Sequence, residues 1–496
     1  MIALTGRSVV AADKGVAALS DTVPARGDTV LGDTVAAVGD TVLGPQHKSL
    51  PPAAWGLTVR EYLATTPHLD DLQTPVLTMD RFGLDANRAV MADWATAAGV
   101  RLAPHGKTSM SPQLWKEQLD AGAWGITLAT GWQVQVGRAL GLGRIMLANA
   151  LLDPTGLRWA AAEIASDPNF ELYSWVDGVD SVREMERHLG SAPAGVKLNV
   201  IVELGGPHGR TGARGLAAAH EVADAVHASP RLRLAGVGGY EGALAHDRTS
   251  EGLAAVRHYL DEIAILHQEL AAAGRYDEFL GRSRPGDAAS DTGAPRESTG
   301  ATAGEARSAR AGRSAIVTAG GSAYPDLVVE RLAGLADEEG AHGVPTTVVL
   351  RSGAYLIHDD GFYSGISPLA AGRAERSLRS AMHGWARCVS RPEAELALLD
   401  AGKRDLPFDE GLPVPQRLAG PASIALPEGA TVSALNDQHT FLRLPGGTAA
   451  DVPVGSVVRL GLSHPCTAFD KWRLIPVIDD AAAERPRVVD FLPTYF

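Results

Sequence analysis

Short apolar runs of strand length alternate with longer amphipathic segments through most of this chain. Segments with the 3.6-residue period of a helix include 80–98, 131–140, 215–228 and 251–273. The candidate strands are 74–79, 100–105, 125–130, 144–150, 170–176, 196–202, 232–240, 315–321 and 346–351. Such alternation predicts a parallel sheet, and about eight units would close a (β/α)8 barrel. Nine candidates are one too many, so we expect a strand at one end to belong elsewhere.

The pattern changes after about residue 346. Short apolar runs such as VPVGSVVRLGL and WRLIPVID are separated there by Gly and Pro, which is typical of an all-β domain. We therefore predict an α/β protein. It has a TIM-like (β/α)8 barrel over residues 51–345 and a C-terminal all-β domain over 346–496.

Two segments of biased composition lie outside this pattern. Residues 1–50 carry little bulky apolar surface to offset the entropy of ordering, so we interpret them as a flexible low-complexity tail, with a short exposed hairpin as the alternative. An Asp-Thr-Val unit recurs in it at 21–23, 28–30, 33–35 and 40–42. Residues 281–313 contain almost no large apolar side chain and are expected to form a disordered insert in the barrel.

Composition excludes several classes of protein. The length of 496 residues implies two or more domains, and the formal net charge of -13 argues against a nucleic-acid partner, because phosphates would be repelled. The two cysteines, Cys388 and Cys466, exclude a disulfide scaffold and favour a reducing compartment. No apolar run approaches the roughly 20 residues that cross a bilayer, and the start lacks a secretory signal. We expect a cytoplasmic protein with no membrane partner.

Polar side chains recur at the ends of the predicted strands, where the active sites of barrels lie. Lys107 follows the second strand, and desolvation there would lower the pKa of its amine, as a Schiff-base lysine requires. The alternative is a lysine that reaches solvent or pairs with a carboxylate. The backbone N–H groups of Gly320, Gly321 and Ser322 precede a predicted helix and suit a phosphate. Together these features indicate pyridoxal phosphate. Other strand-end residues are His105, Asn149, Asp177, Glu203, Arg210, Tyr240 and Glu241.

The segment LSHPCTAFDKW in the predicted β domain places His464 two residues before Cys466. In a strand this spacing puts both side chains on one face, where imidazole and thiolate would favour zinc and leave positions open for substrate. The alternative is a buried cysteine beside a surface histidine. His439 would be a further candidate if it lay nearby, and Cys388 is expected in the core.

At these motifs the sequence resembles the D-serine dehydratase and D-threonine aldolase family, whose barrel is shared with alanine racemase. APHGKTSMSP and LSHPCTAFDKW are the specific pieces, and supporting ones run in order from about 74 to 475. Many members read PHxKxHK, whereas here Ser109 and Met110 follow Lys-Thr. This departure suggests a divergent subgroup similar to proteins called amino acid deaminases.

The resemblance implies roles for nine of these residues in binding the cofactor and the metal. Lys107 would bind the cofactor covalently and act as the catalytic base, and Arg210 would face the pyridine nitrogen. Gly320, Gly321 and Ser322 would hold the phosphate, with Tyr355 a further contact, and Tyr240 would line the pocket. His464 and Cys466 would bind Zn²⁺ or Mn²⁺. The family also suggests a homodimer.

We therefore expect a lyase that acts on small D-3-hydroxy amino acids, with D-serine as the first choice. β-Elimination would convert it to an oxo acid and ammonia. Cleavage of D-threonine by an aldolase is the alternative, because the family associates His-x-Cys with dehydratases and His-x-Asp with aldolases. An amino acid racemase and a non-catalytic protein that binds pyridoxal phosphate are the remaining alternatives.

Overall fold

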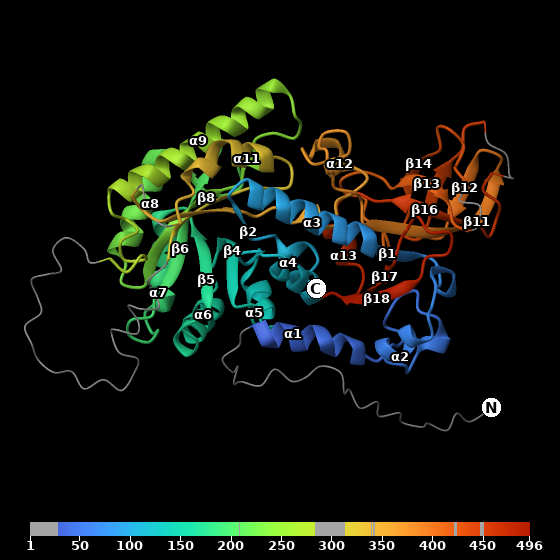
Figure 1. Cartoon of the computed structure of the whole chain (residues 1–496), viewed down its shortest axis with the longest axis horizontal. Coiled ribbons are helices and arrows are strands. Elements are labelled where there is room, and N and C mark those ends of the chain that lie inside the picture. Colours follow the sequence, from blue (N-terminus) through green and yellow to red (C-terminus); the bar gives the residue numbers. More distant parts are fainter. Residues whose placement is uncertain are drawn as a thin grey trace, which may run out of the picture.

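The computed structural model describes residues 28–207, 209–282, 313–338, 340, 343–420, 424–446 and 451–496. The first Asp-Thr-Val unit and most of the predicted insert, 283–312, lie outside the described residues. Two sheets organise the described chain, a parallel barrel sheet and a largely antiparallel one beside it (Figure 1).

The barrel sheet contains eight neighbouring parallel strands within the described residues. Their order around the sheet is β2 (Arg101–Leu102), β10 (Thr346–Leu350), β9 (Ala315–Ala319), β8 (Leu232–Gly239), β6 (Leu198–Gly205), β5 (Glu171–Val176), β4 (Arg144–Ala150) and β3 (Ile126–Leu128). A short strand, β7 (Ala213–Arg214), pairs with β6. A single bridge between His105 and Thr127 joins the two end strands. The predicted (β/α)8 architecture is therefore confirmed.

Helices cover the outside of this sheet, and side chains fill its inside. The helices are α3 (Arg81–Ala97), α4 (Pro112–Asp120), α5 (Gly131–Ala139), α6 (Pro154–Ser166), α7 (Val179–Leu189), α8 (Leu216–Ala228), α9 (Ser250–Ala272) and α11 (Pro325–Leu332). Since both faces of the strands are covered, the strands read as nearly continuous apolar runs. The interior holds a packed cluster that includes Met146, Tyr173, Trp175, Ile201 and Ile316. The barrel is thus a core rather than a pore, and its strand ends carry the polar side chains.

The second sheet gathers strands from both ends of the chain. Its main path is β14 (Thr431–Leu435), β15 (Thr440–Arg443), β12 (Leu396–Leu399), β11 (Met382–Glu393), β1 (Val76–Asp80), β17 (Leu474–Ile478) and β18 (Val488–Pro493). β16 (Val457–Gly461) also pairs with β11, and β13 (Val414–Leu418) pairs with β16. β1 pairs antiparallel with β11 and parallel with β17. It is the ninth predicted strand, and as expected it belongs elsewhere.

Two boundaries expected from the sequence need correction. The division at 345/346 falls between β9 and β10, which are paired neighbours in the barrel sheet, while β1 lies in the other sheet. Local patterns identify a strand but not its partner, because pairing depends on distant residues. The first sheet therefore ends with β10, at Leu350.

The segment 28–50 is not a tail in this structure. It contains helix α1 (Asp28–Ala37), which packs against α4, and it buries Leu31, Leu43 and Leu50. The Thr34 hydroxyl donates to the carbonyl of Leu140 at 3.4 Å. The prediction gave too much weight to the repeated small residues and too little to the three buried leucines, whose burial stabilises the ordered segment.

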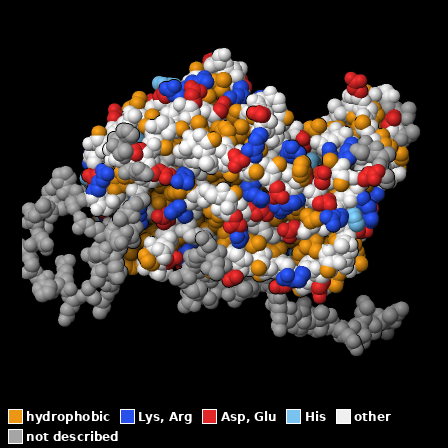
Figure 2. Space-filling model, in the orientation of Figure 1, with side chains coloured by type: hydrophobic (Ala, Val, Ile, Leu, Met, Phe, Trp, Pro, Cys, Tyr) orange, Lys and Arg blue, Asp and Glu red, His pale blue; other side chains and the backbone are white. Residues whose placement is uncertain are grey.

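Three short helices complete the described chain: α2 (Val59–Ala64), α12 (Phe362–Ile366) and α13 (Cys466–Phe469). None of the helices in the described residues combines the length and apolarity needed to span a membrane. Basic and acidic side chains are interspersed over the face seen in Figure 2.

Candidate active site

Lys107 lies in a short 3-10 helix, Gly106–Thr108, separated from the end of β2 by three residues. Trp115 of α4 holds this turn, because its indole Nε1 donates to the carbonyl of Gly106 at 3.0 Å. A Cβ atom on Gly106 would lie 2.4 Å from that Nε1, so only glycine fits there. The turn is thereby fixed, and the half-buried Lys107 side chain begins from a defined position.

Three basic side chains lie near His105 at this end of the barrel, where Glu203 and Glu241 are close to Arg351. The Nδ1 atom of His105 is buried and has no hydrogen-bond partner among the described residues. Burial, together with the charges of Lys107, Arg351 and Arg210, holds the pKa of His105 well below its usual range. The imidazole is therefore neutral, and three cations converge on it. Such a site suits an anionic cofactor and a substrate carboxylate.

Arg351, which the sequence reasoning did not include, is buried at the mouth of the barrel. Its Nη1 donates to Thr318 Oγ1 at 2.6 Å and its Nη2 to the carbonyl of Gly239 at 2.5 Å. The guanidinium also lies over the ring of Trp175, 5.2 Å from its centroid. Burial lowers its pKa, and the nearby Glu241 opposes that effect. A signal was present in the sequence, because TTVVLR ends a buried strand with a charge.

The backbone N–H groups of Gly320 and Gly321 donate to a carboxylate of the protein and do not face an open phosphate site. Gly320 N donates to Glu241 Oε2 at 2.9 Å, and Gly321 N donates to Glu241 Oε1 at 2.6 Å. Glu241 is fully buried, and burial raises its pKa although these amides lower it. Two of the three amides expected to receive a phosphate are thus engaged within the protein, because Glu241 follows the neighbouring strand β8 at the same edge of the sheet.

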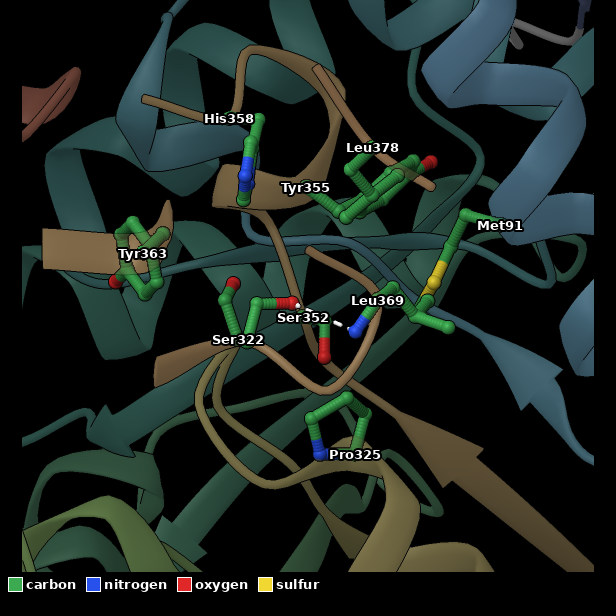
Figure 3. A pocket seen from close by; sticks show the side chains of 10 residues that line it. Met91, Ser322, Pro325, Ser352, Tyr355, His358, Tyr363, Leu369 and Leu378 are labelled. Atoms are coloured by element: carbon green, nitrogen blue, oxygen red, sulfur yellow. Dashed lines mark hydrogen bonds between the residues drawn. The ribbon is translucent and has the colours of Figure 1, made fainter. Parts of the chain in front are cut away.

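Ser322 and Tyr355 are brought together at a small cavity of about 10 Å³, which has room for about one water molecule. Figure 3 shows Ser322 and Ser352 in its centre, with Tyr355, His358 and Tyr363 around them. The Tyr355 hydroxyl accepts from Gln118 Nε2 at 3.0 Å, and burial raises its pKa to about 12. Pro325, the first residue of α11, lines the same cavity. Hydroxyl groups and a helix N-terminus are phosphate-binding groups, but a cavity of this size would have to widen to admit a phosphate.

Arg210 and Tyr240 are also in contact. The guanidinium carbon of Arg210 lies 5.0 Å from the ring centroid of Tyr240, which follows β8 and is 39% exposed. Arg210 is exposed in the loop between β6 and β7. Both side chains therefore lie on the face of the barrel that carries Lys107 and His105.

His464 and Cys466 are close enough to hydrogen-bond, although not for the reason predicted. His464 has a left-handed backbone, with φ +56°, and Cys466 begins α13, so the segment is a loop and a helical turn rather than a strand. The Thr108 hydroxyl lies 3.5 Å from Cys466 Sγ, which joins this loop to the turn of Lys107. The pair and the lysine thus share one site.

The electrostatics of the pair follow from this arrangement. The hydrogen bond with Cys466 raises the pKa of His464 to about 9, and Asp409 adds to the effect. Burial acts to raise the pKa of Cys466, but the hydrogen bonds of His464 and Thr108 outweigh it, so the thiol pKa is lowered. In the absence of a cation this pair is therefore an imidazolium beside a readily ionised thiol. A divalent cation such as Zn²⁺ would displace the proton of His464 and take the imidazole and the thiolate as ligands.

The structure limits how many protein ligands a metal would have. Within the described part of the chain, no group of three or more His, Cys, Asp or Glu side chains is arranged to hold one ion. His439 lies at the tip between β14 and β15, where it lines an open hollow with Lys403 and Asp437. Only His464 and Cys466 remain as candidates. Cys388 is buried, as expected for a core residue.

Comparisons with known proteins agree with this architecture. Residues 381–478 match the family model described as "Putative serine dehydratase domain". The chain is 26% identical over 416 residues to the D-threonine aldolase of Arthrobacter sp, which covers 83% of this chain and 91% of the relative.

Two solved structures share the fold. The D-threo-3-hydroxyaspartate dehydratase from Delftia sp. HT23 has a TM-score of 0.62 at 20% identity, over 86% of this chain and 99% of its own. An alanine racemase-like protein from Idiomarina loihiensis has a TM-score of 0.60 at 16% identity, over 84% and 97%. The fold is therefore that of the alanine racemase-like proteins, as the sequence predicted.

The resemblance to the D-serine dehydratase and D-threonine aldolase family is confirmed by the matched domain and the aldolase relative. Aldolases and dehydratases are both lyases, and the expectation of an enzyme is confirmed.

Proposed function

We propose that this protein is a lyase that depends on pyridoxal phosphate and a divalent metal and acts on D-3-hydroxy amino acids. D-Serine dehydration to pyruvate and ammonia is the first choice. The observation that carries the proposal is the 3.5 Å contact between Thr108 Oγ1 and Cys466 Sγ. It brings the turn of Lys107 to the His464–Cys466 loop, so an amine and a pair of metal-ligating side chains face one another.

Both groups fit the residues present. Lys107 would hold the cofactor, Ser322 and Tyr355 would be near its phosphate, and Tyr240 and Arg210 would flank its ring. The Gly320 and Gly321 amides would contribute to the phosphate site only after releasing Glu241. His464 and Cys466 would hold Zn²⁺, with Mn²⁺ as the alternative. When bound, pyridoxal phosphate supplies an electron sink for a carbanion at Cα, and the metal supplies a Lewis acid for the β-hydroxyl.

The side chains of this protein would do the rest of the chemistry. Lys107 Nζ would remove the Cα proton, and the hydroxyl would leave from Cβ, so that water is lost from the substrate. The resulting aminoacrylate hydrolyses to an oxo acid and ammonia. The cations that converge on neutral His105 would orient the α-carboxylate. Held near the ring nitrogen, Arg210 would keep it unprotonated and leave more of the reaction to the metal.

The charges around the metal pair support a substrate with a neutral side chain. Asp409 Oδ2 lies 2.5 Å from His464 Nδ1, and Asp359 Oδ2 accepts from His464 N at 3.1 Å. The Asp409 carboxylate at this end of the site would disfavour a second substrate carboxylate, whereas burial raises the pKa of Asp359 and reduces its contribution. Serine and threonine side chains carry no such charge.

Aldol cleavage of D-threonine is the second candidate, favoured by the aldolase relative that spans most of both chains. A racemase and a non-catalytic protein that binds pyridoxal phosphate are less favoured, because the curated relatives are aldolases and the alanine racemase-like neighbour shows the fold alone. A homodimer and a cytoplasmic location stay predictions.

Product analysis tests the proposal. The purified protein is incubated with D-serine or D-threonine, with and without a chelator. Dehydration yields pyruvate or 2-oxobutyrate with ammonia, whereas cleavage of D-threonine yields glycine and acetaldehyde. Lys107→Ala should abolish turnover and the visible absorbance of the bound cofactor. Turnover unaffected by chelation and by Cys466→Ala would refute the role of the metal.

A further inference from the structure

Asp409 is held against His464 by two contacts of its carboxylate. It lies in the loop between β12 and β13, and its side chain is 39% exposed. Oδ2 lies 2.5 Å from His464 Nδ1, and Oδ1 accepts from the Thr467 hydroxyl at 2.6 Å. Since each oxygen has its own partner, the carboxylate is fixed in position and orientation relative to the imidazole.

The backbone of His464 is fixed as well. Its N–H donates to Asp359 Oδ2 at 3.1 Å, and Asp359 Oδ1 accepts from Tyr363 N at 2.8 Å and Gly361 N at 3.1 Å. Asp359 is 1% exposed. Asp359 therefore ties the His464 backbone to the start of α12, while Asp409 ties the side chain. Asp359 and Asp409 thus have different roles, since one fixes the backbone of His464 and the other fixes its imidazole.

We propose that Asp409 is the positioning residue that presents Nε2 of His464 to the metal. An imidazole with Nδ1–H donating to a carboxylate carries its lone pair on Nε2, and the carboxylate makes that nitrogen a stronger ligand. Asp409 supports the ligand and is not a third ligand, because the described residues include no group of three side chains set to hold one ion. The inference rests on the proposed metal site.

The test measures Zn²⁺ affinity directly. Full-length protein carrying its cofactor is stripped of metal and titrated with Zn²⁺ against a chromophoric chelator. Asp409→Ala should bind Zn²⁺ about 10- to 100-fold more weakly, the usual effect of losing such a partner. Asp409→Asn retains an oxygen acceptor for Nδ1–H and should lose less affinity than the alanine variant. Visible absorbance of the cofactor and the thermal unfolding midpoint of the metal-free protein are recorded for each.

Glu410→Ala is the matched control, because it removes the same charge from the neighbouring exposed residue. Its Zn²⁺ affinity should stay within about twofold of the parent protein. Parental affinity in Asp409→Ala would overturn the inference, as would an equal loss in Glu410→Ala, since simple charge would then explain it. If the parent protein binds Zn²⁺ no better than His464→Ala, the proposed metal site itself fails.

Discussion

Replacing Asp80 by Asn should remove a pH-dependent penalty on folding. Asp80 is 5% exposed at the end of β1, and burial, with the negative charge of Asp480 added, raises the pKa of its carboxyl from 3.8 to about 6. The folded state therefore holds the proton more tightly than the unfolded chain. The contribution of this proton to the free energy of unfolding is fully present below about pH 4 and is lost as the pH rises through about 6.

The magnitude follows from the shift. Two pKa units correspond to about 3 kcal/mol of unfolding free energy, at about 1.4 kcal/mol for each unit. About 2 kcal/mol of this falls between about pH 4.5 and 7, according to the linkage relation. Asn keeps the side-chain oxygen that accepts from Phe82 N at 3.2 Å, so the start of α3 stays capped.

Urea denaturation across this pH range, followed by tryptophan fluorescence, gives the measurement. Other carboxyls titrate too, so the relevant quantity is the difference in unfolding free energy between the variant and the parent protein at each pH. That difference should move by about 2 kcal/mol in favour of the variant as pH rises. Asp480→Asn removes one cause of the shift and should show a smaller change. A difference that stays constant with pH would refute the reasoning.

Two further predictions concern buried charges. Arg138 is 1% exposed and contacts Glu163 at 3.0 Å and Asp167 at 2.7 Å. Arg138→Ala leaves these two buried carboxylates without their cation and should lower the free energy of unfolding, measured by urea denaturation, by about 3–5 kcal/mol. A loss below about 1 kcal/mol would contradict this. Glu241→Gln replaces one accepting oxygen by an NH₂ group, which would face the N–H of Gly320 or Gly321 without forming a hydrogen bond. The free energy of unfolding, measured by the same assay, should fall by about 1–3 kcal/mol. Unchanged stability would show that this contact is unimportant.

Much of the barrel could be predicted because each strand carries its own signal. The eight strands are buried on both faces, so each appears in the sequence as an apolar run that ends near a polar residue. The local sequence of a strand does not show which other strand it pairs with. The run 74–79 looks like its neighbours, yet β1 pairs with β11 and β17, more than 300 residues away.

The candidate site shows a similar division. Lys107, Ser322 and Cys466 could be proposed from motifs, because residue type and short spacing suggest their chemistry, and their roles stay predictions. Asp409 and Arg351 could not be assigned a role, because their partners lie on other elements. The strand predicted for His464 and Cys466 was wrong, since a positive φ at a non-glycine residue depends on outside contacts such as the one with Asp359.

The place of β1 in the second sheet has a consequence for how this protein is made. During synthesis β1 is completed early, but both of its neighbours, β11 and β17, leave the ribosome only after the whole barrel. Its β11 edge stays unpaired until residues 382–393 are made, and its β17 edge until residues 474–478 are made. A fragment that starts at 346 would lack a central strand, so the two halves of this molecule cannot be separated by cutting between them.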